Sequence, residues 1–141
     1  MSSISLSQAR TLLDAALAES RRHGFKPMGI VVIDAAAQVV ASVREDGATA
    51  LRLDIALGKS AAAVGMGASS RVLTQRAKDL PAFFGAVASA SQQKFIPQTG
   101  AVLIKSADGA VMGAAGASGG TGDEDEQIVI AGIAAAGLVH G

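Results

Sequence analysis

The chain contains 141 residues, of which 12 are basic and 12 are acidic, so its formal net charge is zero. No segment concentrates lysine or arginine, which removes the electrostatic attraction on which most nucleic-acid binding depends. We therefore expect no nucleic-acid partner. Cysteine is absent, and this excludes disulfides, thiolate nucleophiles and zinc sites of the finger type.

The hydropathy of the chain argues against a membrane or secreted protein. Residues 1–20 contain Asp14 and Glu19 within their apolar pattern and lack the basic start of a secretory signal. No run approaches the roughly 18 consecutive apolar residues that a membrane span needs. We expect a cytoplasmic protein without a membrane partner, built as one domain over residues 1–141.

The first half of the chain predicts a helix, a hairpin and a second helix. Apolar residues recur at spacings of three and four over residues 7–22, and this helix is expected to end near Gly24. Two β-branched runs, 27–34 and 38–46, predict an antiparallel hairpin because only three alanines separate them. Residues 48–70 keep helical spacing despite Gly58, Gly65 and Gly67, so close packing is expected to use the missing side chains.

The second half predicts two short helices, another hairpin and a closing helix. The short helices cover 72–78 and 81–91, and Asp108-Gly109 marks the turn of a hairpin over 100–118. The closing helix is expected over 123–139, and the residues expected to face the sheet are Ile128, Ala131, Gly132, Ala135 and Leu138. Short hairpins with helices between and after them indicate an α+β sandwich with a central antiparallel sheet.

The segment GAAGASGGTGDEDEQ, residues 113–127, admits three interpretations. A phosphate-binding loop needs Lys and Ser or Thr after its last glycine, whereas four acids follow here and would repel phosphate. A hydrolase elbow matches G-x-S-x-G at 116–120, and Ser118, Asp123 or Asp125, and His140 follow in hydrolase order, but that fold has a larger, mostly parallel sheet. We favour the third, in which glycines form a bend, Thr121 or Gly122 caps a helix, and the acids stabilise its first turn.

Three segments together resemble the GlcG/HbpS family, and they extend over nearly the whole chain. Residues 109–138 resemble its closing signature, 29–48 its first hairpin, and 54–66 its second helix with an embedded lysine, Lys59. The chain departs from the family pattern at Ala36 and Ala37, where glycines are usual, so this turn must avoid positive φ or bear strain. It also has Gly100 to Leu103 where the family commonly has a Gly-Gly-x-Pro run.

The resemblance implies a profilin-like or roadblock-like α+β sandwich, with helices on the faces of the sheet, assembled as a dimer or a larger ring. Members include haem-binding or haem-sensing proteins, a protein of glycolate-utilisation operons, and the C-terminal domain of PduO-type corrinoid adenosyltransferases. The expected function is therefore a small-molecule binding protein that acts as a homo-oligomer, with haem or another tetrapyrrole as the candidate ligand. The low aromatic content, 3%, fits stability gained partly through self-association.

A haem ligand requires an axial donor, and the sequence contains neither Tyr nor Cys. His23 is the candidate iron ligand because it ends the first predicted helix, beside two arginines suited to propionates. Its alternative is an ordinary histidine at a helix end. Met28, Met66 and Met112 fall in apolar patterns typical of core residues, and four phenylalanines offer little apolar surface for haem without a neighbouring subunit.

Arg44, Asp46 and Lys59 complete the candidate ligand-binding set, because the resemblance adds weight to these positions. Lys59 stands among alanines, so it is expected either to extend to solvent or to pair with Asp54 or Asp46. A structural ion pair is favoured over a substrate-binding trio. Two alternative functions stay open: a small enzyme acting on an organic acid, with Asp46 as base, and a non-catalytic assembly subunit.

Overall fold

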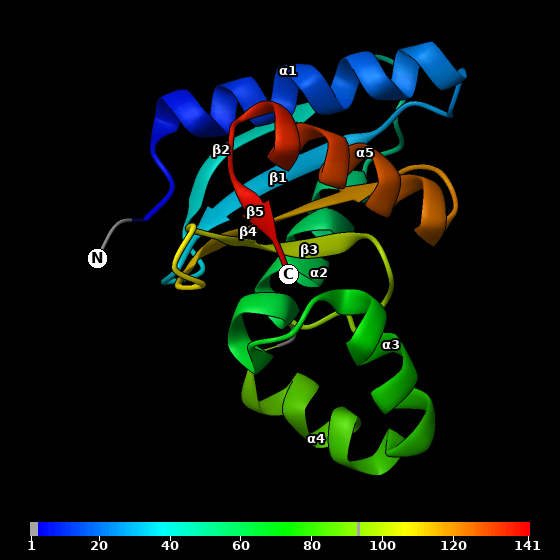
Figure 1. Cartoon of the computed structure of the whole chain (residues 1–141). Coiled ribbons are helices and arrows are strands. Elements are labelled where there is room, and N and C mark those ends of the chain that lie inside the picture. Colours follow the sequence, from blue (N-terminus) through cyan, green and yellow to red (C-terminus); the bar gives the residue numbers. More distant parts are fainter. Residues whose placement is uncertain (1–2, 93) are drawn as a thin grey trace.

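The computed structural model describes residues 3–92 and 94–141. A five-stranded antiparallel sheet of order β2-β1-β4-β3-β5 lies between helices (Figure 1). The strands are β1 (Gly29–Asp34), β2 (Val39–Arg44), β3 (Ala101–Lys105), β4 (Val111–Ser118) and β5 (Val139–His140). This arrangement confirms the predicted α+β fold with a central antiparallel sheet.

The helices form a layer on each side of the sheet. One face carries α1 (Leu6–His23) and α5 (Gly122–Ala135), whose apolar side chains form the main core with β1, β3 and β4. The other face carries α2 (Arg52–Met66), and α3 (Ser70–Asp79) and α4 (Pro81–Ala90) extend this layer away from the sheet (Figure 1). The two hairpins and the order of helices follow the prediction from the sequence.

Local signals set the limits of α1 and the first hairpin. Ser5 caps α1, its Oγ accepting from Gln8 N–H, and Gly24 ends the helix in the left-handed region at φ 67°. In the β1–β2 turn, the Asp34 carboxylate accepts from the backbone N–H groups of Ala36 and Gln38, both at 2.9 Å. Ala37 adopts φ 62°, so the turn bears the strain that glycine would avoid.

Glycines let the layers approach closely. A Cβ on Gly116 of β4 would lie 2.3 Å from Ser60 Oγ of α2, and a Cβ on Gly132 of α5 would lie 2.6 Å from the Leu12 carbonyl oxygen of α1. Gly58 lies in α2, and the side chain of Ile96 fills the space beside it. A Cβ on Gly58 would lie 2.6 Å from the Ile96 side chain. Close packing therefore explains Gly58, as expected. The expectation is wrong for Gly65 and Gly67, where a Cβ would meet no atom within 4 Å in the described structure, and Gly67 instead ends α2 at φ 68°.

The closing helix is shorter than predicted. It ends at Ala135 because Gly137 turns the chain at φ 74°, and β5 then pairs with Ile104 and Lys105 of β3. The predicted apolar face was also partly wrong, since Ala135 is exposed. The residues of α5 that are buried are Asp125, Ile128, Val129, Gly132 and Ile133.

Among residues 3–92 and 94–141, no helix is both long enough and apolar enough to cross a membrane.

Candidate functional site

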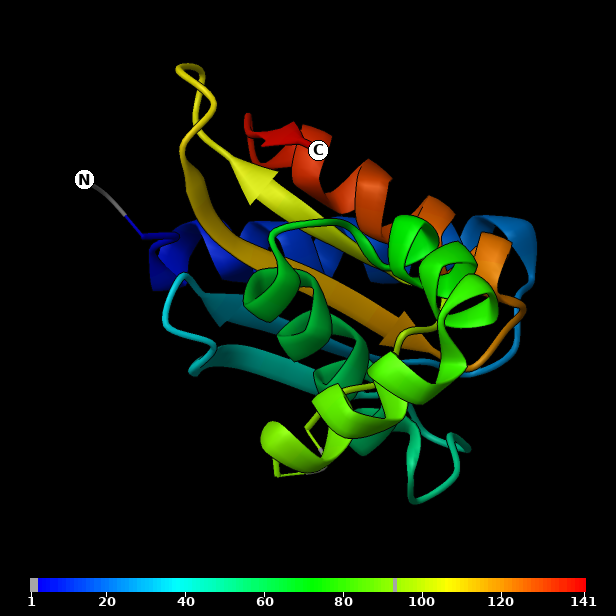
Figure 2. The ribbon, with the colours of Figure 1, turned by 90° about the horizontal axis from the view of Figure 1, so that it is seen from below.

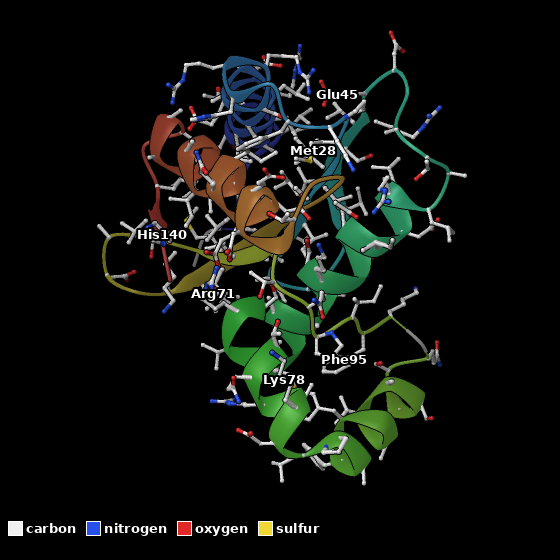
Figure 3. All side chains as sticks on the ribbon, turned by 90° about the vertical axis from the view of Figure 1, so that its right-hand side faces the viewer. Met28, Glu45, Arg71, Lys78, Phe95 and His140 are labelled. Carbon is white, nitrogen blue, oxygen red and sulfur yellow. The ribbon has the colours of Figure 1, made fainter. Side chains whose placement is uncertain are left out.

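The glycine-rich bend between β4 and α5 is held by a capping box. Thr121 Oγ1 accepts from Glu124 N–H at 3.1 Å, and Glu124 Oε1 accepts from Thr121 N–H at 3.0 Å. Arg71 of α3 donates to Asp123 and Glu126, which ties two of the four acids to a neighbouring helix (Figure 3). The acids therefore have structural partners, and the interpretation as a bend and helix cap is confirmed.

Ser118 is not arranged as a nucleophile. Ser118 is buried, with 2% of its surface exposed, and its Oγ accepts from Arg52 Nη1 at 3.1 Å. The candidate histidine of that triad, His140, lies in the edge strand β5. A hydrolase elbow needs a base within hydrogen-bond reach of the serine, and here an arginine occupies that position. The interpretation as a hydrolase elbow is therefore wrong.

A hollow of about 270 Å³ lies beside the bend. Arg52 reaches it with its guanidinium held by Thr49 Oγ1 at 3.0 Å as well as by Ser118. Lys26 also lines the hollow, but so does Glu124, whose carboxylate caps the backbone there. An anion in this hollow would compete with that carboxylate for the positive end of α5.

Lys59 forms a buried ion pair that the sequence did not reveal. Its Nζ lies 3.0 Å from Asp125 Oδ2 and also donates to the Ala117 carbonyl oxygen at 3.0 Å. Gly120 N–H donates to Asp125 Oδ1 at 2.9 Å, so the contacts of this pair join α2, β4, the glycine-rich bend and α5. The predicted partners, Asp54 and Asp46, are both exposed, and that part of the prediction is wrong.

Burial controls the electrostatics of this pair. Lys59 is 3% exposed and Asp125 is 1% exposed. Burial raises the pKa of Asp125, while the Lys59 ammonium and the Gly120 N–H counteract part of that rise. A lysine enclosed by a carboxylate and a carbonyl oxygen has little surface left for a ligand, which favours a structural role for Lys59.

Arg44 and Asp46 lie at the surface, at the end of β2 and in the turn that follows. The Arg44 guanidinium donates to the Ala48 carbonyl oxygen at 3.0 Å. Glu45 between them accepts from Met28 N–H at 2.8 Å and pairs with Arg21, which fixes the start of β1 (Figure 3). No hydrogen bond or ion pair within the described ranges joins Lys59 to Arg44 or Asp46.

His23 occupies the last turn of α1, facing α5. Its ring stacks on Phe25, with centroids 5.1 Å apart and planes 13° apart. Its Nε2 lies 3.1 Å from Glu19 Oε2 and 3.0 Å from Gln127 Nε2 of α5. The imidazole is 32% exposed, so it is accessible from one side and fixed from the other. The pKa of Glu19 is lowered, chiefly by its hydrogen bond from Arg22, so this carboxylate stays ionised beside the ring.

The sequence matches a family model described as "Haem degrading protein HbpS-like" over residues 4–134. The chain belongs to the HbpS-like family. The HbpS-like fold recurs in solved structures. A PduOC–haem complex superposes with a TM-score of 0.86 at 24% identity, covering 97% of both chains. The ORFY protein of Klebsiella pneumoniae gives 0.87 at 20% identity, covering 97% of this chain and 92% of its own. HbpS gives 0.81 at 23% identity, covering 95% and 90%. No curated protein sequence matches the chain.

In this HbpS-like chain, few donors suited to haem iron reach the surface. Met28 and Met112 are 0% and 4% exposed within the main core, as the sequence indicated. Met66 is partly buried and packs against the cluster between α2, α3 and α4. His23 and His140 are exposed. Imidazole nitrogen is an established axial ligand of haem iron, so the exposed donors fit that group.

Proposed function

We propose that this HbpS-like protein binds haem or another tetrapyrrole at the His23 end of α1. The family description and the similarity to a PduOC–haem complex support a haem-type ligand. The observation that carries the choice of site is the His23 imidazole, which is 32% exposed and held by Phe25 and Glu19. His140 is the other exposed imidazole, but it lies on a two-residue edge strand without an aromatic partner among the described residues.

The residues around His23 suit the parts of a haem. His23 would provide the iron donor through Nδ1, because its Nε2 already contacts Glu19, Gln127 and Arg22. Arg22 and Lys26 would attract the carboxylates, and Arg22 is already oriented by its 2.9 Å contact with Glu19. Glu19 holds the imidazole in place, and a carboxylate bonded to a ligating histidine raises its basicity. When bound, haem supplies one-electron and dioxygen chemistry.

Replacing His23 by alanine is expected to remove the haem site. Titration of the purified protein with haemin, followed by the Soret band, should show a shifted band for the wild type and at least a tenfold weaker binding for His23→Ala. His140→Ala removes the other histidine and serves as the matched control, which should bind as the wild type does. Equal binding by the wild type and His23→Ala would rule out His23 as the ligand.

We propose in addition that the protein works as a homo-oligomer. Several large apolar side chains are exposed in the single chain, and two of them, Leu80 and Phe83, lie close together at the start of α4, each 55% exposed. Covering such surface in an assembly would add stability. Light scattering should give a mass that is a multiple of 14.0 kDa, and a mass of 14.0 kDa at micromolar concentration would contradict this proposal.

A further inference from the structure

A groove runs along α2 on the side of the molecule that carries α4. It consists of two adjoining hollows, one of about 330 Å³ between the β1–β2 turn and α2, the other of about 260 Å³ between α2 and α4. The hollows share Ala61, Ser91 and Lys94, so they adjoin at these residues, and together they are called the groove. Figure 2 shows α2 and α4 on this side of the sheet, opposite α1. Volumes in this range are typical of small-molecule sites.

The walls of the groove are apolar at one end and polar at the junction of the hollows. Met66, Val87 and Phe95 line the hollow between α2 and α4. Lys94 is the one charged residue in the lining of either hollow, and its ammonium takes part in no ion pair or side-chain hydrogen bond within the described part of the chain. An apolar trough with a single positive charge is complementary to an apolar molecule that carries one negative charge.

The structure leaves open space beside Gly65 of α2. Glycine lowers helix stability relative to alanine, and Gly58 on the same helix has a packing reason because Ile96 fills the space beside it. A Cβ on Gly65, in contrast, would meet no atom within 4 Å in the described structure. Leu57, Ala61 and Gly65 follow one another at a spacing of four along α2 and decrease in size, so the side chains on this face of the helix leave more space at Gly65 than at Leu57.

We propose that this groove binds an apolar carboxylate, whose carboxylate meets Lys94 and whose hydrocarbon body lies over Ala61 and Gly65. The site is separate from His23, because α1 and α2 cover opposite faces of the sheet (Figure 1). It therefore adds a second ligand to the proposed function and does not depend on haem binding.

The hydrocarbon part of the proposal is tested with decanoate and Gly65→Leu. A Cβ at this position meets no atom within 4 Å in the described structure, and leucine favours the helix, so the variant should extend a side chain into the groove and keep or raise its melting temperature. Calorimetry should show decanoate binding to the wild type and at least tenfold weaker binding to Gly65→Leu. Gly85→Leu is the matched control: Gly85 is also a helical glycine with open space at its Cβ, but it lies outside the groove, and binding should be unchanged.

The charged part is tested with Lys94→Gln. Decanoate should bind about tenfold more weakly, because a hydrogen bond to a charged group is lost, while decan-1-ol should bind the variant and the wild type equally. Lys78→Gln, on α3, is the matched control and should bind decanoate normally. His23→Ala should also keep decanoate binding. Wild type that binds no decanoate, unchanged binding by Gly65→Leu or Lys94→Gln, or loss in His23→Ala would overturn the proposal.

Discussion

Replacing Lys59 by methionine is expected to lower the free energy of unfolding by about 3 to 5 kcal/mol at pH 8. The substitution removes the ammonium 3.0 Å from Asp125 Oδ2 and leaves a carboxylate that is 1% exposed without its counter-charge. A buried charge without a partner is among the most destabilising single changes in a core. Urea denaturation of the wild type and the variant measures the difference.

The pH dependence of this loss has a definite sign. Burial raises the pKa of Asp125, and without the Lys59 ammonium it should rise further. A carboxyl whose folded-state pKa is raised contributes stability below its unfolded pKa of about 3.9 and loses that contribution as pH rises through the folded pKa. The difference between Lys59→Met and the wild type should therefore shrink as the pH falls from about 8 towards 5.

A double variant separates the charge from the shape of the side chain. In Lys59→Met/Asp125→Asn no buried charge is left, and the asparagine oxygen can still accept from Gly120 N–H. This variant should recover more than half of the lost stability, since an uncharged pair of similar volume is tolerated. A loss below about 1 kcal/mol in Lys59→Met, or one that is equal at pH 5 and pH 8, would contradict a buried ion pair.

Replacing Gly116 by valine is expected to lower the free energy of unfolding by about 3 kcal/mol or more. A Cβ at this position of β4 would lie 2.3 Å from Ser60 Oγ and 2.8 Å from the Ala56 carbonyl oxygen, both on α2. The two groups are buried, and one is backbone, so α2 would have to move away from the sheet. Circular dichroism and urea denaturation measure the loss.

The control for Gly116→Val is the same change at Gly65, where a Cβ meets no atom within 4 Å in the described structure. Gly65→Val should change the free energy of unfolding by less than about 1 kcal/mol. If Gly116→Val is tolerated as well as Gly65→Val, then α2 does not pack on β4 as closely as described.

The order of elements was predictable because local signals dominate it. Short links between β-branched runs allow only antiparallel hairpins. Gly24 ends α1, and Asp108-Gly109 forms the turn of the second hairpin, as these residue types usually do. The error came at the end of the closing helix. Gly137 interrupts an apolar run that keeps helical spacing, and a two-residue strand such as β5 depends on the edge of β3, which no local pattern shows.

The partner of Lys59 was missed because it lies 66 residues away in the sequence. The four acids 123–126 look alike in sequence, and all four were interpreted as stabilising the first turn of the closing helix. One signal separates Asp125 from the others: it lies three and four residues before Ile128 and Val129, on the buried face of α5. The position of His23 at the end of α1 was predictable from helical spacing, whereas its contacts with Phe25 and Gln127 required the fold.

Locating iron in crystals of the haem-loaded protein tests the proposed function most directly. Anomalous scattering at the iron edge marks the metal independently of the rest of the ligand. We predict a single strong peak per chain, within bonding distance of a His23 ring nitrogen at the end of α1. A peak beside His140, or one in the groove between α2 and α4, would contradict the assignment of His23 as the haem ligand.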